Sequence, residues 1–256
     1  MQASGMISWL TERNAIFMGF GRHCSWRGLA TIRGVEAARI EAGPGRVPWL
    51  TRMVQHTLWV LTYFLVVLPY RKAARGVPAC DGRRLLFVAN HVSLLDTPML
   101  AAHLHGHVPL LVLGDAGTWR RSFVRRLLSA RLGFLLDRGR HAKEVVRQLR
   151  AFGACGSRFT LIVFPEGHRG DGIHVQECLP GIYHVAREAK LPMVPVFIEN
   201  MQLVSSKATP FRPVRGLRKV VLHFGAEIAP EKYLGLPRAE FCRQVRERIQ
   251  ALAPRS

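Results

Sequence analysis

Residues 85–98, LLFVANHVSLLDTP, decide how the rest of the chain is interpreted. The first five are apolar, which is the length of a buried strand, and Asn90 and His91 then break the pattern. Asp96 follows five residues after the histidine, and Pro98 suits the first turn of a helix just behind it. The stretch therefore predicts a buried strand, a short loop that carries His91, and a helix that starts near Asp96.

Similar short apolar runs recur to the C-terminus, with helical patterns between them. This alternation predicts an α/β fold, with a mixed, largely parallel sheet flanked by helices. Pro195 in one run suggests an edge strand or a strand start, and residues 233–254 predict a helix that packs through one apolar face. The expected strands are LLFVA (85–89), PLLVL (109–113), GFLL (133–136), FTLIVF (159–164), MVPVFI (193–198) and KVVLHF (219–224).

The N-terminal part has a different character. Residues 57–70, TLWVLTYFLVVLPY, are uncharged, but a membrane span needs about 20 apolar residues, so the run is marginal for crossing a bilayer. A core helix is the alternative, yet the aromatic residues in the run and the basic flank RKAAR (71–75) favour membrane association. We expect a helical membrane-associating region over residues 1–75 and the α/β domain over residues 76–256.

The amino-acid composition limits the kinds of partner and the compartment that we expect for this chain. The chain has 37 Lys and Arg against 17 Asp and Glu, and the resulting net charge of +20 favours an anionic partner such as a membrane surface, a phosphorylated substrate, an acidic protein or nucleic acid. Zinc-finger spacing, an RNA-binding signature and a basic tail are all missing from the sequence, so nucleic acid is the weaker alternative. The five scattered cysteines and the lack of a signal peptide favour a reducing compartment such as the bacterial cytosol.

His91 and Asp96 are the first candidates for chemistry. Reactive groups in open α/β sheets collect at the carboxyl ends of strands, where His91 is expected. A histidine that takes a proton near neutral pH needs one ring nitrogen free and the other held by an acceptor, which Asp96 can supply. The alternative is that His91 merely ends a strand and that Asp96 caps a helix.

Two further blocks follow other predicted strands. In VFPEGHRGDG (163–172), proline and glycine enforce a sharp turn that presents Glu166 and Arg169 at the same edge as His91. In GFLLDRGR (133–140), Arg138 belongs either to a solvated charge cluster or to a phosphate clamp. The histidines of HLHGH (103–107) are two apart, but no cysteine or acid nearby completes a metal site, so we expect no metal.

These blocks, in this order, resemble the glycerolipid acyltransferase family, best known from lysophosphatidate acyltransferases. The resemblance covers roughly residues 55–230, and His168 and Gly170 stand where the family usually has Thr and Ser. The matching residues are Asn90, His91 and Asp96 in the first block, Asp137 and Arg138 in the second, Phe164, Pro165, Glu166, Gly167 and Arg169 in the third, and Val194, Pro195 and Val196 in the fourth.

The resemblance implies a function and a set of roles. His91 would deprotonate an acceptor hydroxyl that attacks an acyl thioester, with Asp96 orienting the ring, and no cofactor or acyl-enzyme would be needed. The donor would be acyl-CoA or an acyl carrier protein thioester, and the acceptor lysophosphatidate or another lysolipid such as a lyso-ornithine lipid. The enzyme would act at the cytoplasmic face of the inner membrane, monotopic or anchored by a single helix, on an anionic surface. The implied substrate-binding residues are Asn90, Arg138, Glu166, Gly167 and Arg169.

Overall fold

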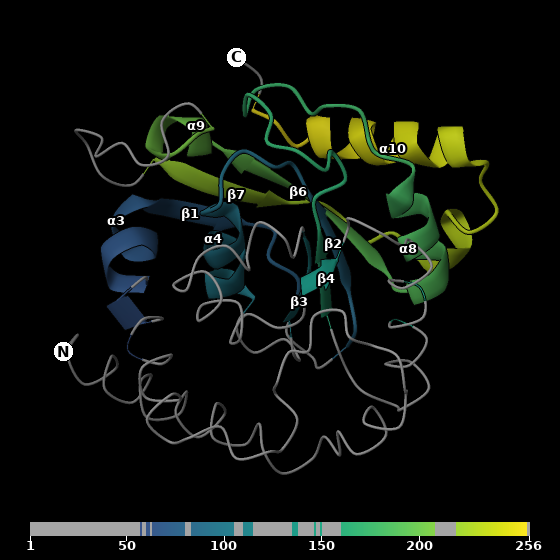
Figure 1. Cartoon of the computed structure of the whole chain (residues 1–256), viewed down its shortest axis with the longest axis horizontal. Helices are drawn as coiled ribbons and strands as arrows, with labels where there is room; N and C mark the ends of the chain where they lie inside the picture. The colour runs from purple at the N-terminus through teal and green to yellow at the C-terminus, as the bar shows by residue number, and fades with distance from the viewer. Residues whose placement is uncertain are drawn as a thin grey trace, which may run out of the picture.

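A twisted sheet forms the centre of the computed structural model, which describes residues 57, 60–61, 63–79, 83–104, 110–114, 135–137, 146, 149, 160–207 and 219–254. Within these residues the sheet has seven strands in the order β1-β7-β6-β2-β5-β3-β4 (Figure 1). The strands are β1 (Arg71–Arg75), β2 (Leu86–Ala89), β3 (Leu110–Gly114), β4 (Leu135–Asp137), β5 (Thr160–Val163), β6 (Met193–Glu199) and β7 (Val220–Phe224).

The sheet is largely parallel, as the sequence predicts. Strands β6, β2, β5, β3 and β4 run in one direction, and β7 pairs antiparallel with β6. All six predicted strands are found with small differences at their ends, so the α/β fold class is confirmed. Since the parallel strands share one direction, the loops after β2 and β5, which are neighbours, emerge side by side.

Helices cover both faces of the sheet (Figure 1). On one face, Leu86 and Val88 of β2 join a core with residues of α8 and α10. On the other, Phe87 and Ala89 join a second core with residues of α4 and of the N-terminal helices. The helical elements are η3 (Tyr63–Val67, a π-helix), α3 (Leu68–Tyr70), α4 (Asp96–His103), α8 (Gly181–Ala189), α9 (Met201–Val204), η4 (Pro230–Lys232) and α10 (Arg238–Gln250).

The C-terminal helix α10 packs as predicted. Phe241, Val245 and Ile249, three or four residues apart, are buried in the core between α8 and the sheet. This spacing places them on one face of the helix, and burial of three large apolar side chains fixes the position of α10 against the sheet.

The apolar N-terminal run divides between core and surface. Val67 and Tyr70 are buried in the same core as residues of α4, whereas Leu61, Phe64, Leu65 and Leu68 are 46%, 45%, 66% and 36% exposed. No helix in the described part of the chain is both long and apolar enough to cross a membrane.

Strand β1 was not predicted. Its residues, Arg71–Arg75, were interpreted only as a basic flank, but they pair in parallel with β7 at the edge of the sheet. An edge strand rich in basic side chains fits the general pattern in which charge blunts an exposed sheet edge. The sheet thus begins inside the region expected to associate with membrane, and the division at residue 75 stays a prediction.

The expectation for Pro195 was wrong. β6 lies between β2 and β7, so Pro195 is in an interior strand. The ladder with β7 is irregular beside Pro195. Val196 pairs with Phe224 and the next bridge joins Met193 to Ile228, so two residues on β6 face three on the other strand. Between these pairs, the carbonyl of Pro195 accepts the N–H of Gly225 at 2.8 Å. Proline is tolerated there because this bulge does not need its missing N–H.

Candidate active site

His91 and Asp96 meet in the loop between β2 and α4. The carboxylate oxygen Oδ2 of Asp96 accepts hydrogen bonds from His91 Nδ1 at 2.8 Å and from the backbone N–H groups of Val92 and Ser93 at 2.7 and 2.8 Å. Because Oδ2 is an acceptor, Nδ1 of the neutral ring carries the proton and the lone pair lies on Nε2. Asp96 is fully buried, whereas the His91 side chain is 19% exposed, so the ring can be reached from outside.

Asp96 is not a simple helix cap. The cap position of α4 is Leu95, and no side chain caps that terminus. The Asp96 carboxylate instead faces back along the chain toward Val92 and Ser93. The loop therefore folds onto the carboxylate, and this also brings the imidazole to it.

The imidazole is supported from the adjacent strand. Its ring stacks on Phe164, which directly follows β5, with 4.4 Å between centroids and planes 24° apart. One edge of the histidine is thus held by a carboxylate and one face by an aromatic ring, which restricts the orientation of Nε2.

The main chain of His91 is clamped by the loop after β5. Its N–H donates to Oε1 of Glu166 at 2.8 Å, and its carbonyl accepts the N–H of Gly170 at 2.7 Å. Glu166 is 1% exposed and its Oε2 accepts the N–H of Gln176 at 3.3 Å. Burial raises the pKa of Glu166 above its ordinary value, and the hydrogen bonds from His91 and Gln176 oppose that rise in part.

Two glycines allow this loop to turn so tightly. Gly167 has a φ of +68°, in the left-handed region that glycine adopts without steric cost. A Cβ on Gly170 would lie 2.8 Å from Oε2 of Glu166, so a side chain there would push the carboxylate away from its partners. Because Gly170 has no side chain, the Glu166 carboxylate can occupy this position.

Asn90 ties the end of β2 to β6. Its amide oxygen accepts the N–H of Ile198 at 2.6 Å, and its amide nitrogen donates to the carbonyl of Ile198 at 3.2 Å. The side chain is 3% exposed. The described hydrogen bonds of Asn90 and Glu166 are to backbone groups, and the contact of these two residues with substrate stays a prediction.

A buried hydroxyl pair was missed from the sequence. Ser93 Oγ donates to Ser205 Oγ at 2.7 Å and accepts the N–H of Leu95 at 3.2 Å. This contact joins the His91–Asp96 loop to the residue after α9. No local pattern distinguishes these two serines from surface serines, so tertiary contacts alone find them.

Of the two arginines among the predicted substrate-binding residues, the structure describes one. Arg169 is half-buried in the same loop as Glu166. Arg138 lies outside the described residues, although Asp137 before it ends β4 at the shared carboxyl edge. Their predicted roles are not tested by these positions.

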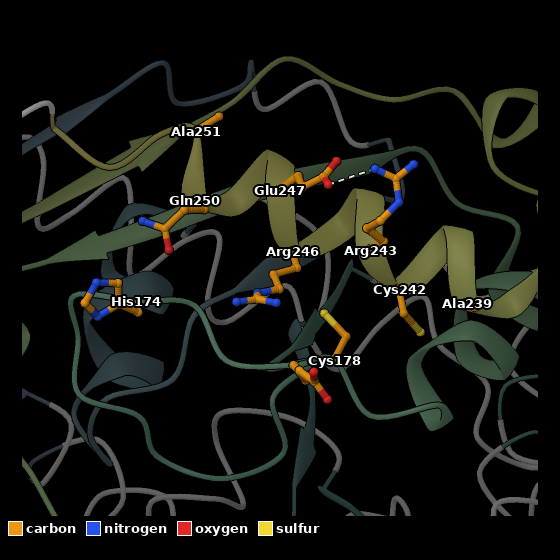
Figure 2. Close-up of a pocket in the computed structure, with 10 residues that line it drawn as sticks. His174, Cys178, Ala239, Cys242, Arg243, Arg246, Glu247, Gln250 and Ala251 are labelled. Atoms are coloured by element: carbon orange, nitrogen blue, oxygen red, sulfur yellow. Dashed lines mark hydrogen bonds and ion pairs between the residues drawn. The ribbon is translucent and has the colours of Figure 1, made fainter.

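A hollow that His91 does not line lies between α10 and residues 174–178 (Figure 2). Cys178 and Cys242 line it as free thiols. Burial raises the pKa of Cys178 to about 12, so this thiol is not a nucleophile near neutral pH. The described residues contain no group of three or more side chains suited to a metal ion.

A comparison with family models identifies the kind of protein. The model described as Acyltransferase matches residues 71–199, half of the chain. The chain belongs to the acyltransferase family. The matched part of this acyltransferase runs from β1 to the end of β6 and includes His91, Asp96 and the Glu166 loop.

The fold of the acyltransferase is also found among solved structures. It is similar to the crystal structure of the 1-acyl-sn-glycerophosphate (LPA) acyltransferase PlsC from Thermotoga maritima, with a TM-score of 0.56 and 20% sequence identity. The alignment covers 92% of this chain and 86% of that one. At this identity the likeness establishes the fold. A search of curated proteins gave no significant match to the chain.

Proposed function

We propose that this acyltransferase moves an acyl chain from an acyl thioester to the free hydroxyl of a lysophospholipid, with 1-acyl-sn-glycerol 3-phosphate as the leading acceptor. The observation that carries the proposal is the His91 imidazole, held at Nδ1 by a buried carboxylate with Nε2 left to act, in a chain of the acyltransferase family. The activity named for the similar Thermotoga maritima protein supports this choice of acceptor.

The reaction follows from that geometry. Nε2 of His91 takes the proton of the acceptor hydroxyl as its oxygen attacks the thioester carbonyl carbon. The imidazolium that forms is stabilised by Asp96, whose own hydrogen bonds from Val92 and Ser93 hold the carboxylate still. The carbon–sulfur bond then breaks, the proton passes from Nε2 to the thiolate, and the products are an ester and a free thiol. The donor is acyl-CoA or the thioester of an acyl carrier protein.

The acceptor phosphate needs cationic partners. Arg169, in the loop that clamps His91, and Arg138, after β4, are the side chains we assign to it, because guanidinium groups bind phosphate through two donors at once. If the natural acceptor carries a different headgroup, as in a lyso-ornithine lipid, these arginines are the residues whose roles change.

Membrane attachment is part of the proposal. Leu61, Phe64, Leu65 and Leu68 expose apolar surface close to the basic strand β1. Apolar side chains that enter the acyl boundary beside cations that attract anionic headgroups are the usual elements of a monotopic contact. We place the enzyme on the cytoplasmic face of the inner membrane, where its lysolipid acceptor would also reside.

The test is product identification. Purified enzyme is incubated with isotopically labelled acyl-CoA and, in parallel, with lysophosphatidate, other lysophospholipids and a lyso-ornithine lipid, and each product is identified by mass. The proposal predicts labelled phosphatidate as the fastest product. Faster acylation of a lyso-ornithine lipid would support acyltransferase activity but overturn lysophosphatidate as the acceptor. Acyl transfer to none of these lysolipids would overturn the proposed function.

A further inference from the structure

The C-terminal helix α10 holds the loop that follows the Glu166 turn. Oε1 of Gln250 accepts the N–H of Val175 at 2.8 Å, and Nε of Arg246 donates to the carbonyl of Val175 at 2.9 Å. Nε2 of Gln250 also donates to the carbonyl of Ile173 at 3.3 Å. Figure 2 shows Arg246 and Gln250 on the side of α10 that faces this loop, while Arg243 and Glu247 pair with each other elsewhere on the helix.

These contacts continue to the histidine. Val175 has both of its backbone polar groups bound by α10, so the next peptide, whose N–H belongs to Gln176, has little freedom. That N–H donates to Oε2 of Glu166, and Oε1 of Glu166 accepts the N–H of His91. An unbroken series of hydrogen bonds therefore runs from α10 through the loop and one buried carboxylate to the main chain of His91.

The series is tightly packed at its centre. A Cβ built on Gly170 would lie 2.8 Å from Oε2 of Glu166 and 3.2 Å from Cγ of Gln176, and the N–H of Gly170 holds the carbonyl of His91. Because Glu166, Gly170 and Gln176 lie this close together, a shift of the loop at Gln176 should move Glu166, Gly170 or both. Either movement changes a bond to His91.

The anchor itself is rigid. Phe241, Val245 and Ile249 bury one face of α10 in the core, and Arg246 and Gln250, four residues apart, share another. Side chains on a packed helix hold a loop more firmly than contacts within the loop would.

We propose that Arg246 and Gln250 are positioning residues of the active site, which fix the 173–176 loop and through it the Glu166 clamp on His91. The expected loss of kcat rests on the proposed function, with His91 as the base. The expected loosening of the loop and of the His91 main chain does not depend on that function. Displacement of a catalytic group by about 1 Å can lower a rate by about 10²-fold, so a loosened rather than lost clamp should lower kcat by about tenfold.

The test compares Gln250→Ala and Arg246→Ala with Arg243→Ala in the full-length protein. Arg243 is a matched control because the contacts described for it, with Glu240 and Glu247, lie within α10. Hydrogen exchange followed by mass spectrometry reports on the peptides that contain His91 and Gly170. Because local opening exposes amides that the native loop protects, both test variants should exchange there about tenfold faster than wild type, with the control unchanged.

Kinetics supply a second readout. The test variants should lose kcat and keep the KM for acyl donor and for acceptor, which a general loss of folded protein or of substrate binding would not produce. Gln250→Glu keeps the acceptor for Val175 and Arg246→Lys keeps a donor, so each should recover much of the lost rate. Gln250→Met, which keeps the side-chain length without its hydrogen bonds, replaces the alanine variant if that one does not fold.

Two results overturn the inference: unchanged exchange at His91 and Gly170 in both test variants, or an equal increase in Arg243→Ala. Failure of the proposed function is a separate result. If wild-type protein acylates no lysolipid, the exchange comparison alone decides the role of α10.

Discussion

Replacing Asp96 by asparagine should remove a charge from the site while its hydrogen bonds stay in place. Three N–H groups, from His91, Val92 and Ser93, converge on Oδ2. An amide oxygen fits that position, whereas an amide NH2 would face three donors. The NH2 must therefore take the position of Oδ1, which is buried and accepts no hydrogen bond from the described residues.

The size of the effect follows from this orientation. The His91 tautomer is kept, and what is lost is the attraction between the imidazolium of the transition state and the carboxylate. For unit charges about 4 Å apart at an effective dielectric constant of about 20, that attraction is about 4 kcal/mol. Since each 1.36 kcal/mol is tenfold in rate, kcat should fall by about 10³-fold. The buried NH2 without an acceptor should also lower the free energy of unfolding by about 1–3 kcal/mol.

The assay is steady-state acyl transfer by wild type, Asp96→Asn and Asp96→Ala, with denaturant unfolding of each protein. Asp96→Ala removes the acceptor as well as the charge, so it should be slower than Asp96→Asn and approach the rate without His91. The reasoning is refuted if Asp96→Asn keeps more than a tenth of wild-type kcat, or if the two variants lose activity equally.

Three further outcomes are expected. Burial raises the pKa of Glu166, so the Glu166 carboxyl group binds a proton more tightly in the native state than in the unfolded chain. The contribution of Glu166 to the free energy of unfolding therefore falls as pH rises from about 4.5 through the native pKa. The free energy of unfolding of wild type minus that of Glu166→Gln should therefore decrease between pH 4.5 and 7, and an increase would contradict this. Wild-type protein should stay bound to membranes at high salt, because salt screens charge but does not weaken the burial of apolar side chains, whereas the double variant Phe64→Ser and Leu65→Ser should be released. Full release of wild type by salt alone would argue against the apolar contact. Arg169→Ala should raise KM for a phosphate-bearing acceptor by about ten- to a hundredfold and leave KM for the donor unchanged, as measured with each substrate varied in turn, and equal changes in both would place the phosphate elsewhere.

The strands were predictable because each is a short apolar run bounded by polar or turn-forming residues. LFVA of β2 and TLIV of β5 are buried throughout, as strands in the middle of a parallel sheet must be. β1 was not predictable, since RKAAR has no apolar pattern and becomes a strand only through its pairing with β7. The bulge that accommodates Pro195 depends likewise on the partner strand.

At the site, the close pair was predictable and the distant supports were not. His91 and Asp96 are five residues apart, so a loop and a helix start suffice to bring them together. Asn90 and Ile198 are 108 residues apart, and Glu166 is 75 from His91, so their hydrogen bonds exist only once β2 has β5 and β6 as neighbours. Polar residues at a strand end suggest contacts with substrate. The side chains of Asn90 and Glu166 instead point inward, where they form hydrogen bonds with backbone groups.

The rate of acyl transfer from labelled acyl-CoA to lysophosphatidate, measured in a single turnover with wild type and with folded His91→Ala, tests the central claim most directly. If Nε2 of His91 is the base, wild type forms labelled phosphatidate without any acylated protein intermediate, and the variant is slower by at least about 10³-fold, toward the upper range for a lost general base. A His91→Ala variant that keeps more than a tenth of the wild-type rate would contradict the claim.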